Sequence, residues 1–333
     1  MTISARAYDE HRQFLWGICY RMTGSAADAD DIVQETFVRA LAKPPADMEA
    51  SLRPWLVKVA VNLSRDQLRR RRRREYYGPW LPSPIATADE SCLETAQLMT
   101  SEISPVARYD LTESVTLAFL LALEALTPSQ RAVLLLRDVF DYSTDETEAA
   151  LGMTESNVKV TLHRARRIIE AYDRNRAANF ADRTAQVRDS LERLLSRLAN
   201  GDVEGLRQML AADVVLVADG GGEVNALAQP VYGRDKVLRL VANLYKAQRS
   251  VTSTSLGVLN GEPAILIARS RVLPGHASFF TMHCELNEHR RLQRLYFVFA
   301  PSKLSALKGG RRFPHTPNLL DDRERLTSRS AAT

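Results

Sequence analysis

The sequence has few cysteines and few lysines, and it lacks any long apolar run. Its three cysteines, Cys19, Cys92 and Cys284, are odd in number and far apart, which argues against a disulfide framework or a zinc ribbon and fits a reducing cytosol. No apolar stretch approaches the ~18 residues of a membrane span, and the polar N-terminus has no signal-peptide core. We therefore expect a cytoplasmic protein with no membrane partner.

Basic residues are in modest excess, and arginine dominates them. The formal net charge is +5, with 38 arginines against seven lysines. A GC-rich genome would produce this bias, but arginine also suits bidentate contacts to phosphate. The 333 residues, 45% of them hydrophobic, are enough for two to three domains that each bury a core.

The segment from 127 to 170 has the pattern of three short helices. Gly152 permits a left-handed turn between the second and third helices, and Thr154 can then cap the third. Pro128 suits a first helical position. This pattern indicates a helix-turn-helix. Two capping boxes are expected, at Thr127 with Gln130 and at Ser143 with Glu146.

The third of these helices has one apolar face and one polar face. In a major groove, its N-terminal residues would meet base edges and its cations would meet phosphates. The alternative is the ordinary solvated face of a helical bundle. The residues expected inside are Val158, Leu162, Ala165 and Ile169, and those expected on the DNA face are Ser156, Asn157, Lys159, His163, Arg164 and Arg167.

Two helices are expected between residues 8 and 42, separated at Thr23-Gly24-Ser25. Acidic side chains near the start of the second helix would stabilise it by interacting with its dipole. Four carboxylates within eight residues also repel one another, however, and suggest an external basic partner. These acids are Asp28, Asp30, Asp31 and Glu35, and the expected buried stripe is Ile32, Val33, Phe37, Ala40 and Leu41.

A third amphipathic helix is expected to start at Pro54 and to end in six consecutive arginines, 69 to 74. Such a run is either a solvated tail or a nucleic-acid contact, and the exposed Asn62 on the same helix favours the second. Binding to phosphate here would depend strongly on salt. The expected buried residues are Trp55, Leu56, Val59, Ala60 and Leu63.

Residues 75 to 110 are rich in proline and read as a linker, with WLPSPI at 80 to 85 as an apolar anchor. Trp80, Leu81 and Ile85 would leave apolar surface in need of a cover, which we expect within this chain. Residues 180 to 300 then form an α+β layer fold: a long helix, short helices, a strand that runs into the glycine turn at 220 to 222, and antiparallel strands near 251–259, 264–272, 277–286 and 291–299.

Three motifs carry a resemblance to a known family. DADDIVQETFVRAL (28–41), RPWLVKVAVNLSRDQLRRRRRR (53–74) and LTPSQRAVLLLRDVFDYSTDETEAALGMTESNVKVTLHRARR (126–167) resemble regions 2 and 4 of the extracytoplasmic-function group of sigma-70 factors. That resemblance implies core RNA polymerase and promoter DNA as partners, and no cofactor or metal. Thr147 and Glu148 depart from the isoleucine and alanine usual there.

The resemblance implies a role for each matching residue. Those implied to bind polymerase are Asp28, Asp30, Asp31 and Gln34; those implied to bind minus-10 DNA are Asn62, Asp66, Arg69 and Arg72; and those implied to bind minus-35 DNA are Ser156, Asn157, Lys159, His163 and Arg164.

The C-terminal part is similar to the cone-shaped SnoaL-like fold, which one sigma subgroup carries as an extension. In that subgroup the linker motif and the glycine turn imply a regulatory contact between Trp80, Leu81, Pro82 and Asp219, Gly220, Gly221, Gly222. The expected organisation is two all-α domains, sigma region 2 (1–77) and region 4 (111–177), joined by a linker (78–110) and followed by an α+β regulatory domain (178–304) and a disordered tail (305–333).

Two other functions compete with a sigma factor. A helix-turn-helix transcription regulator with a ligand-sensing domain would leave the acidic helix and the arginine helix without a purpose. An enzyme is the second, because SnoaL-like folds host acid catalysts in apolar pockets, and the candidates are Asp219, His276 and His283. We interpret Asp219 as a turn carboxylate and expect no catalysis. A small-molecule ligand of the C-terminal domain and a separate anti-sigma protein stay open.

Overall fold

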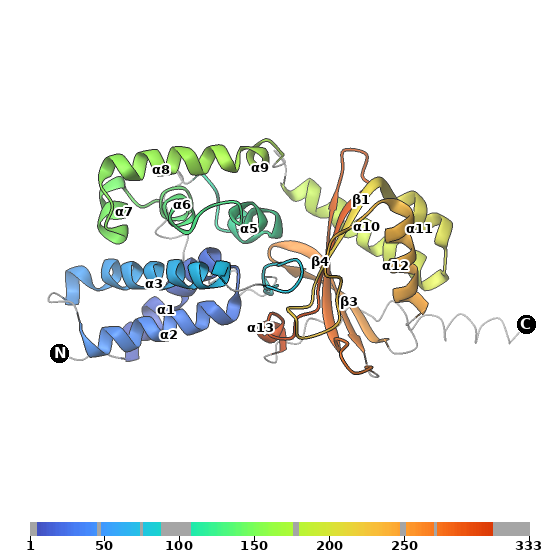
Figure 1. The fold of residues 1–333 in the computed structure, drawn as a ribbon, viewed down its shortest axis with the longest axis horizontal. Coiled ribbons are helices and arrows are strands. Elements are labelled where there is room, and N and C mark those ends of the chain that lie inside the picture. The colour runs from blue at the N-terminus through green and yellow to red at the C-terminus, as the bar shows by residue number, and fades with distance from the viewer. Residues whose placement is uncertain are drawn as a thin grey trace, which may run out of the picture. The chain divides into compact units, whose positions relative to one another are not determined.

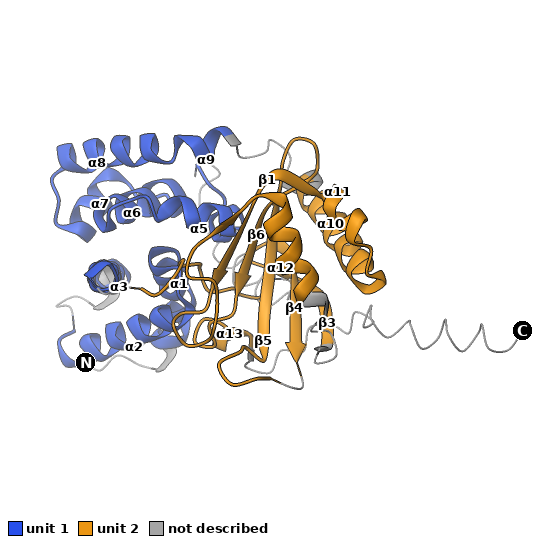
Figure 2. Ribbon diagram, turned by 45° about the vertical axis from the view of Figure 1, so that its right-hand side comes forward, with its two compact units in different colours: residues 1–75, 87–176 blue, residues 76–86, 177–333 orange. Residues whose placement is uncertain are grey.

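The chain forms two compact units. The computed structural model describes residues 5–44, 48–73, 76–87, 108–175, 180–246, 251–269 and 272–308. One unit contains Met1–Glu75 and Thr87–Arg176, and the other contains Tyr76–Ala86 and Ala177–Thr333 (Figure 2). The stretch expected to be a linker is therefore divided, because its first part belongs with the C-terminal unit. Residues 88–107 of it lie outside the described residues.

The first unit opens with three packed helices, α1 (Ala5–Thr23), α2 (Ala26–Ala42) and α3 (Met48–Arg73) (Figure 1). Ser25 caps α2 by accepting a hydrogen bond from the Asp28 backbone N–H. The expected buried stripe of α2 is wrong at its end, since Leu41 is 54% exposed. At 3.6 residues per turn, Leu41 follows Gln34 and Val38 on the outer face.

Helix α3 starts earlier than the sequence suggested, and Pro54 lies inside it. The buried Leu52 explains the difference, because the apolar stripe already begins before the proline. The stripe itself also shifts: Val57 and Val61 are buried, whereas Trp55 and Val59 are only half-buried. The remaining buried side chains of α3 are Leu56, Ala60, Leu63, Ser64 and Leu68.

The helix-turn-helix follows in the same unit. Both capping boxes are confirmed, and Gly152 takes the left-handed conformation with φ 63°. Thr147 is buried, and its hydroxyl donates to the Ser143 carbonyl at 2.8 Å, which is how a polar group fits there. The elements are η1 (Glu113–Val115), α5 (Leu117–Leu123), α6 (Pro128–Leu134), the π-helix η2 (Leu135–Val139), α7 (Thr144–Leu151), α8 (Glu155–Ile168) and α9 (Glu170–Asn175).

The second unit has one sheet with helices on one face (Figure 1). Its strand order is β2-β1-β6-β5-β4-β3. Strands β3 to β6 are antiparallel as predicted, but β1 pairs parallel to β6, which the sequence did not indicate. The strands are β1 (Leu210–Asp219), β2 (Val231–Tyr232), β3 (Val251–Leu259), β4 (Glu262–Arg269), β5 (Phe279–Leu286) and β6 (Leu292–Val298).

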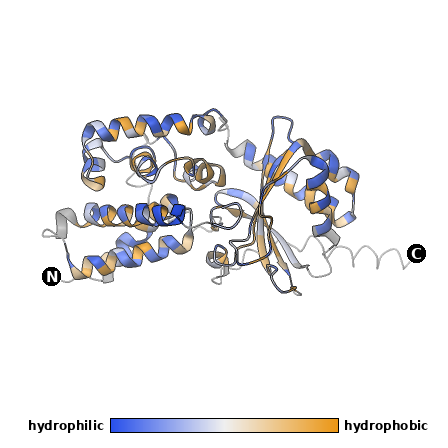
Figure 3. Ribbon diagram, in the orientation of Figure 1, coloured by the Kyte–Doolittle hydropathy of each residue, from blue (hydrophilic) through white to orange (hydrophobic). Residues whose placement is uncertain are grey.

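Three helices cover one face of this sheet: α10 (Phe180–Asn200), α11 (Val203–Met209) and α12 (Arg234–Lys246). Hydrophilic and hydrophobic residues alternate along α8 and α10, as expected for helices with one buried face (Figure 3). Alternate strand residues such as Leu216, Met282 and Phe297 form the core with the helices. In the described parts of the chain, no helix is both long and apolar enough to cross a membrane.

The opposite face of the sheet has a smaller apolar cluster of Leu259, Ala264 and Leu266. Leu307 packs against it, from the short helix α13 (Ser305–Lys308). The disordered tail was expected to begin at 305, so this expectation is wrong for the first four residues, which an apolar contact orders. Residues 309–333 lie outside the described residues.

Candidate functional site

Helix α8 presents a polar face built as the spacing predicted. Val158, Leu162, Ala165 and Ile169 are buried. On the other side, Ser156, Asn157, Lys159, His163 and Arg164 are exposed. The sequence missed Val160, which is 45% exposed on that same polar side. The helix therefore offers hydrogen-bonding groups, cations and the apolar Val160 on a single accessible surface; a second apolar side chain, Ile168, is 43% exposed at the C-terminal end of the helix.

A half-buried ion pair holds α8 on the unit. Arg166 donates to both carboxylate oxygens of Asp138, from Nε at 2.9 Å and from Nη2 at 2.6 Å. Asp138 is 2% exposed and the Arg166 side chain is 41% exposed, so the carboxylate of this bidentate pair is shielded from water and the guanidinium is not. At the helix start, Lys159 pairs with Glu155 at 2.6 Å, but both side chains are exposed and the pair is weak.

Helix α2 has an acidic outer face that continues into apolar side chains. Asp30, Asp31 and Gln34 are exposed, and so are Val38 and Leu41 at 57% and 54%. These five positions share one side of the helix, opposite the buried stripe of Ile32, Val33 and Phe37. An exposed apolar pair beside acids is suited to a protein partner that carries basic and apolar groups.

Asp28 is placed differently from the other acids. It is half-buried, and its carboxylate accepts a hydrogen bond from Gln67 of α3 at 2.8 Å. It lies at a groove of about 370 Å³ between α2 and α3. The groove is lined by Asp28, Asp31, Ile32, Glu35, Arg39, Leu63, Gln67 and Arg70.

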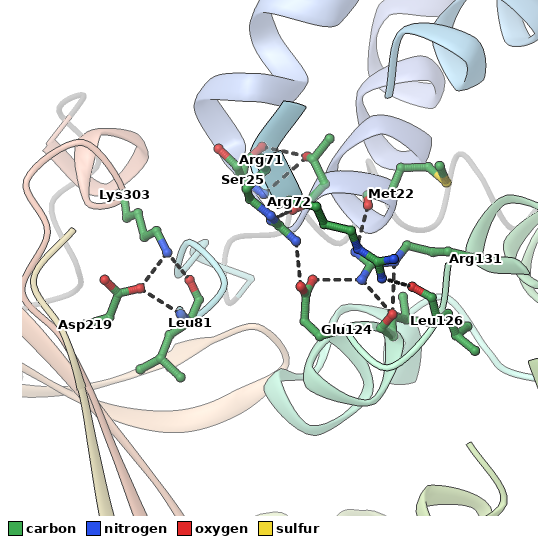
Figure 4. A network of polar contacts seen from close by, with 12 residues as sticks. Met22, Ser25, Arg71, Arg72, Leu81, Glu124, Leu126, Arg131, Asp219 and Lys303 are labelled. Carbon is green, nitrogen blue, oxygen red and sulfur yellow. Dashed lines mark hydrogen bonds and ion pairs between the residues drawn. The ribbon is translucent and has the colours of Figure 1, made fainter. Parts of the chain in front are cut away.

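The side chains of α3 expected at minus-10 DNA already have partners inside the first unit. Asn62 accepts from Arg65 at 3.1 Å, and Arg65 also donates to Ser129 of α6. Asp66 and Arg69 form an exposed pair at 2.8 Å. Arg72 donates to the Leu126 carbonyl (Figure 4).

Glu124 is the centre of a network that joins α3 to the helix-turn-helix. It accepts from Arg71 at 2.6 Å and from Arg131 at 2.8 Å (Figure 4). Arg71 also donates to the Thr23 carbonyl, and the 2%-exposed Arg131 donates to the Met22 carbonyl. Burial alone would raise the pKa of the Glu124 carboxyl, but the charges of Arg131 and Arg71 lower it overall.

In the second unit, residues 76–86, which we term the strap, lie on the carboxylate of Asp219. Asp219 is fully buried at the end of β1. It accepts from the Leu81 backbone N–H at 2.7 Å, from the Tyr76 hydroxyl at 2.6 Å and from the Gly221 N–H at 2.9 Å. Lys303 completes the set at 2.5 Å. The carboxylate thus binds its own turn, as expected, and the strap as well.

Lys303 closes this arrangement from the C-terminal side. It is 7% exposed, pairs with Asp219 and also donates to the Leu81 carbonyl (Figure 4). Its ammonium lies 4.3 Å from the Trp80 ring centroid and 4.8 Å from that of Tyr76, so two rings cover the charge. Neither Tyr76 nor Lys303 is among the residues that the sequence predicted for this contact.

The other end of the strap joins the edge of β3. The Ile85 N–H donates to the Asn260 side chain, and the Asn260 N–H donates to the Ile85 carbonyl at 2.9 Å. Ala86 forms a β-bridge with Leu259. Leu81 and Pro82 are buried between these ends, whereas Trp80 is half-buried.

The glycines after Asp219 make room for this contact. Gly221 and Gly222 have φ values of 64° and 73°. A Cβ on Gly220 would lie 2.6 Å from the Val224 carbonyl oxygen. Side chains are therefore disfavoured at this turn by both conformation and space.

The three residues considered for catalysis differ in their surroundings. Asp219 and His283 are buried, while His276 is exposed in the loop before β5. Burial lowers the pKa of His283 to about 4, which keeps its ring neutral. Cys284 points to the helical core on the opposite face of β5. Among the described residues, no cluster of His, Cys, Asp or Glu side chains could hold a metal ion.

Comparison with known proteins gives consistent matches. The family model for Sigma-70 region 2 matches residues 7–74, and that for Sigma-70, region 4 matches residues 116–169. The ECF RNA polymerase sigma factor SigJ of Mycobacterium tuberculosis (strain ATCC 25618 / H37Rv) is 31% identical over 80% of this chain and 81% of its own length. The probable ECF RNA polymerase sigma factor SigI of the same strain is 27% identical over 91% and 95%.

Among solved structures, the fold is similar to the crystal structure of the Mycobacterium tuberculosis extracytoplasmic function sigma factor SigJ. The TM-score is 0.65 at 25% identity, and the match covers 91% of this chain and 99% of the other. Such coverage includes the C-terminal unit, which neither family model reaches.

Proposed function

The chain belongs to the extracytoplasmic-function group of RNA polymerase sigma factors, and from this premise we propose which of its surfaces bind polymerase and promoter DNA. The protein directs transcription initiation by binding core RNA polymerase and recognising the minus-10 and minus-35 elements. One observation supports this assignment of surfaces. On both α2 and α8, a buried apolar stripe lies on one side of the helix and an exposed polar face lies on the other.

We assign polymerase binding to Asp30, Asp31 and Gln34 of α2, with Val38 and Leu41 extending the contact. Asp28 supports this surface through its bond to Gln67. Minus-10 recognition is assigned to α3, through Asn62, Asp66, Arg69 and Arg72. Minus-35 recognition is assigned to α8, through Ser156, Asn157, Lys159, His163 and Arg164.

The mechanism is binding and strand opening, without catalysis by this chain. Helix α8 positions the enzyme on duplex DNA, and α3 captures minus-10 bases once they are unstacked. The four donors already on Asp219 and the neutral, buried His283 favour a structural C-terminal domain over an enzyme. Since core polymerase works in the cytoplasm, this is the compartment that we propose.

We further propose that the C-terminal domain regulates transcription by holding the strap. The strap lies directly between α3 and the rest of the linker in sequence, so its attachment limits how far regions 2 and 4 can move apart. Support comes from the fully buried Asp219 and from Lys303, which together bind Leu81 through its N–H and its carbonyl.

Run-off transcription tests the function directly. Core polymerase supplemented with this chain should initiate on DNA from upstream of its own gene, and core polymerase alone should not. A helix-turn-helix repressor would bind such DNA without supporting initiation. Mapping the start site then supplies the promoter for the experiments below.

Changing the cations of α8 should weaken minus-35 binding. We expect Lys159→Ala and Arg164→Ala each to cost about 1 to 3 kcal/mol if a bidentate base contact is lost, with relaxed preference at one base pair. A contact to phosphate would instead weaken all sequences alike and reduce the salt dependence. Holoenzyme binding to a panel of minus-35 variants distinguishes the two, with Lys236→Ala, an exposed lysine on α12, as the control. Unchanged binding by both variants would contradict the assignment of α8.

A further inference from the structure

Val160 is an apolar side chain in the middle of a polar surface. Helical spacing of three and four residues places it between Ser156 and His163, with Arg167 one turn beyond His163. It is 45% exposed, whereas Val158 and Leu162 on the opposite side are 1% and 9% exposed. A β-branched residue also has a lower helix propensity than alanine at such a position. Packing within the unit therefore does not account for valine here.

Duplex DNA offers such a side chain one apolar partner in the major groove. The base edges there present donors and acceptors, apart from the 5-methyl group of thymine. Valine cannot hydrogen-bond, so it favours a thymine methyl over the polar edges of other bases. We propose that Val160 specifies a T·A pair in the minus-35 element by contacting this methyl. The inference rests on the assignment of minus-35 recognition to α8.

Deoxyuridine tests this contact because it removes only the methyl. Each thymine of the mapped minus-35 element is replaced in turn, and the affinity of the holoenzyme is measured for the wild type and for Val160→Ala. At one position the replacement should weaken wild-type binding about fourfold, the value for one buried methyl-sized group, and leave the affinity of Val160→Ala unchanged. Val203→Ala, at a 50%-exposed valine of α11, is the control.

If every replacement affects the wild type and Val160→Ala equally, the contact does not exist. Failure of the underlying assignment gives a different result, because Lys159→Ala and Arg164→Ala would then leave minus-35 binding unchanged. Val160 is exposed, so its change to alanine leaves the core of the unit intact.

Discussion

Charge reversal at Asp30 and Asp31 to lysine should abolish binding to core RNA polymerase and leave the fold intact. Both carboxylates are exposed on the outer face of α2, away from the buried Ile32, Val33 and Phe37. Two charges change sign at once, so attraction to a basic partner becomes repulsion. Co-purification with core polymerase measures the effect, and thermal unfolding checks the fold.

The cost to stability should be small. Asp30 lies 4.0 Å from Arg12, and the side chains are 50% and 52% exposed, so this pair is worth at most about 1 kcal/mol. Both positions lie beyond the first turn of α2, which begins at Ala26, and the helix dipole acts mainly within that turn.

A control with the same charge change makes the result specific. Asp189→Lys with Glu192→Lys alters two exposed acids on α10 by the same amount, and it should leave polymerase binding unchanged. Survival of co-purification in the Asp30 and Asp31 double variant would show that the outer face of α2 is not the polymerase surface. Loss of binding in the control would point to net charge instead.

Local features of the fold could be predicted from the sequence, because their causes are local. The capping boxes at Thr127 and Ser143 and the left-handed Gly152 each depend on residues within a few positions. The ends of the helices could not be predicted as well. Leu41 is exposed and not buried, and Pro54 lies inside α3 and not at its start. At a helix end, the contacts that bury a residue come from other helices, which the local sequence does not reveal.

The long-range polar contacts could not be predicted in the same way. Arg131 bonds to a carbonyl 109 positions away, and Lys303 bonds to a carboxylate 84 positions away. A lysine in sequence is normally exposed, and only the fold reveals that Lys303 is buried under two aromatic rings. By contrast, the need of the WLPSPI segment for a cover could be inferred, since its apolar surface is a property of the segment itself.

Releasing the strap should change transcription without changing the promoter that is recognised. Lys303→Met removes the ammonium that joins Asp219 to the Leu81 carbonyl and leaves a buried carboxylate without its cation. Breaking one partner of such a buried pair costs about 3 to 5 kcal/mol, more than the two remaining hydrogen bonds from Tyr76 and Leu81 to Asp219 supply at about 1 kcal/mol each. We therefore expect the strap to detach from the Asp219 end.

Gly221→Val should have the same effect by a different route. Its φ of 64° disfavours a β-branched residue, and a Cβ there would lie 3.0 Å from the Ala300 Cβ. Lys236→Met on the exposed face of α12 is the matched control for the lysine change. Since the surfaces of α2 and α8 are untouched, the start site should stay the same while the amount of transcript changes.

Tryptophan fluorescence reports the strap independently of transcription. With Trp16→Phe and Trp55→Phe, Trp80 is the sole tryptophan of the three in the chain. Its ring now lies against Lys303 and is half-buried, so acrylamide quenching should increase in Lys303→Met and in Gly221→Val. If quenching increased while the amount of transcript stayed the same, the C-terminal domain would not regulate transcription through the strap. Unchanged quenching together with unchanged transcription would mean that neither residue holds the strap, and regulation through this contact would have to be abandoned.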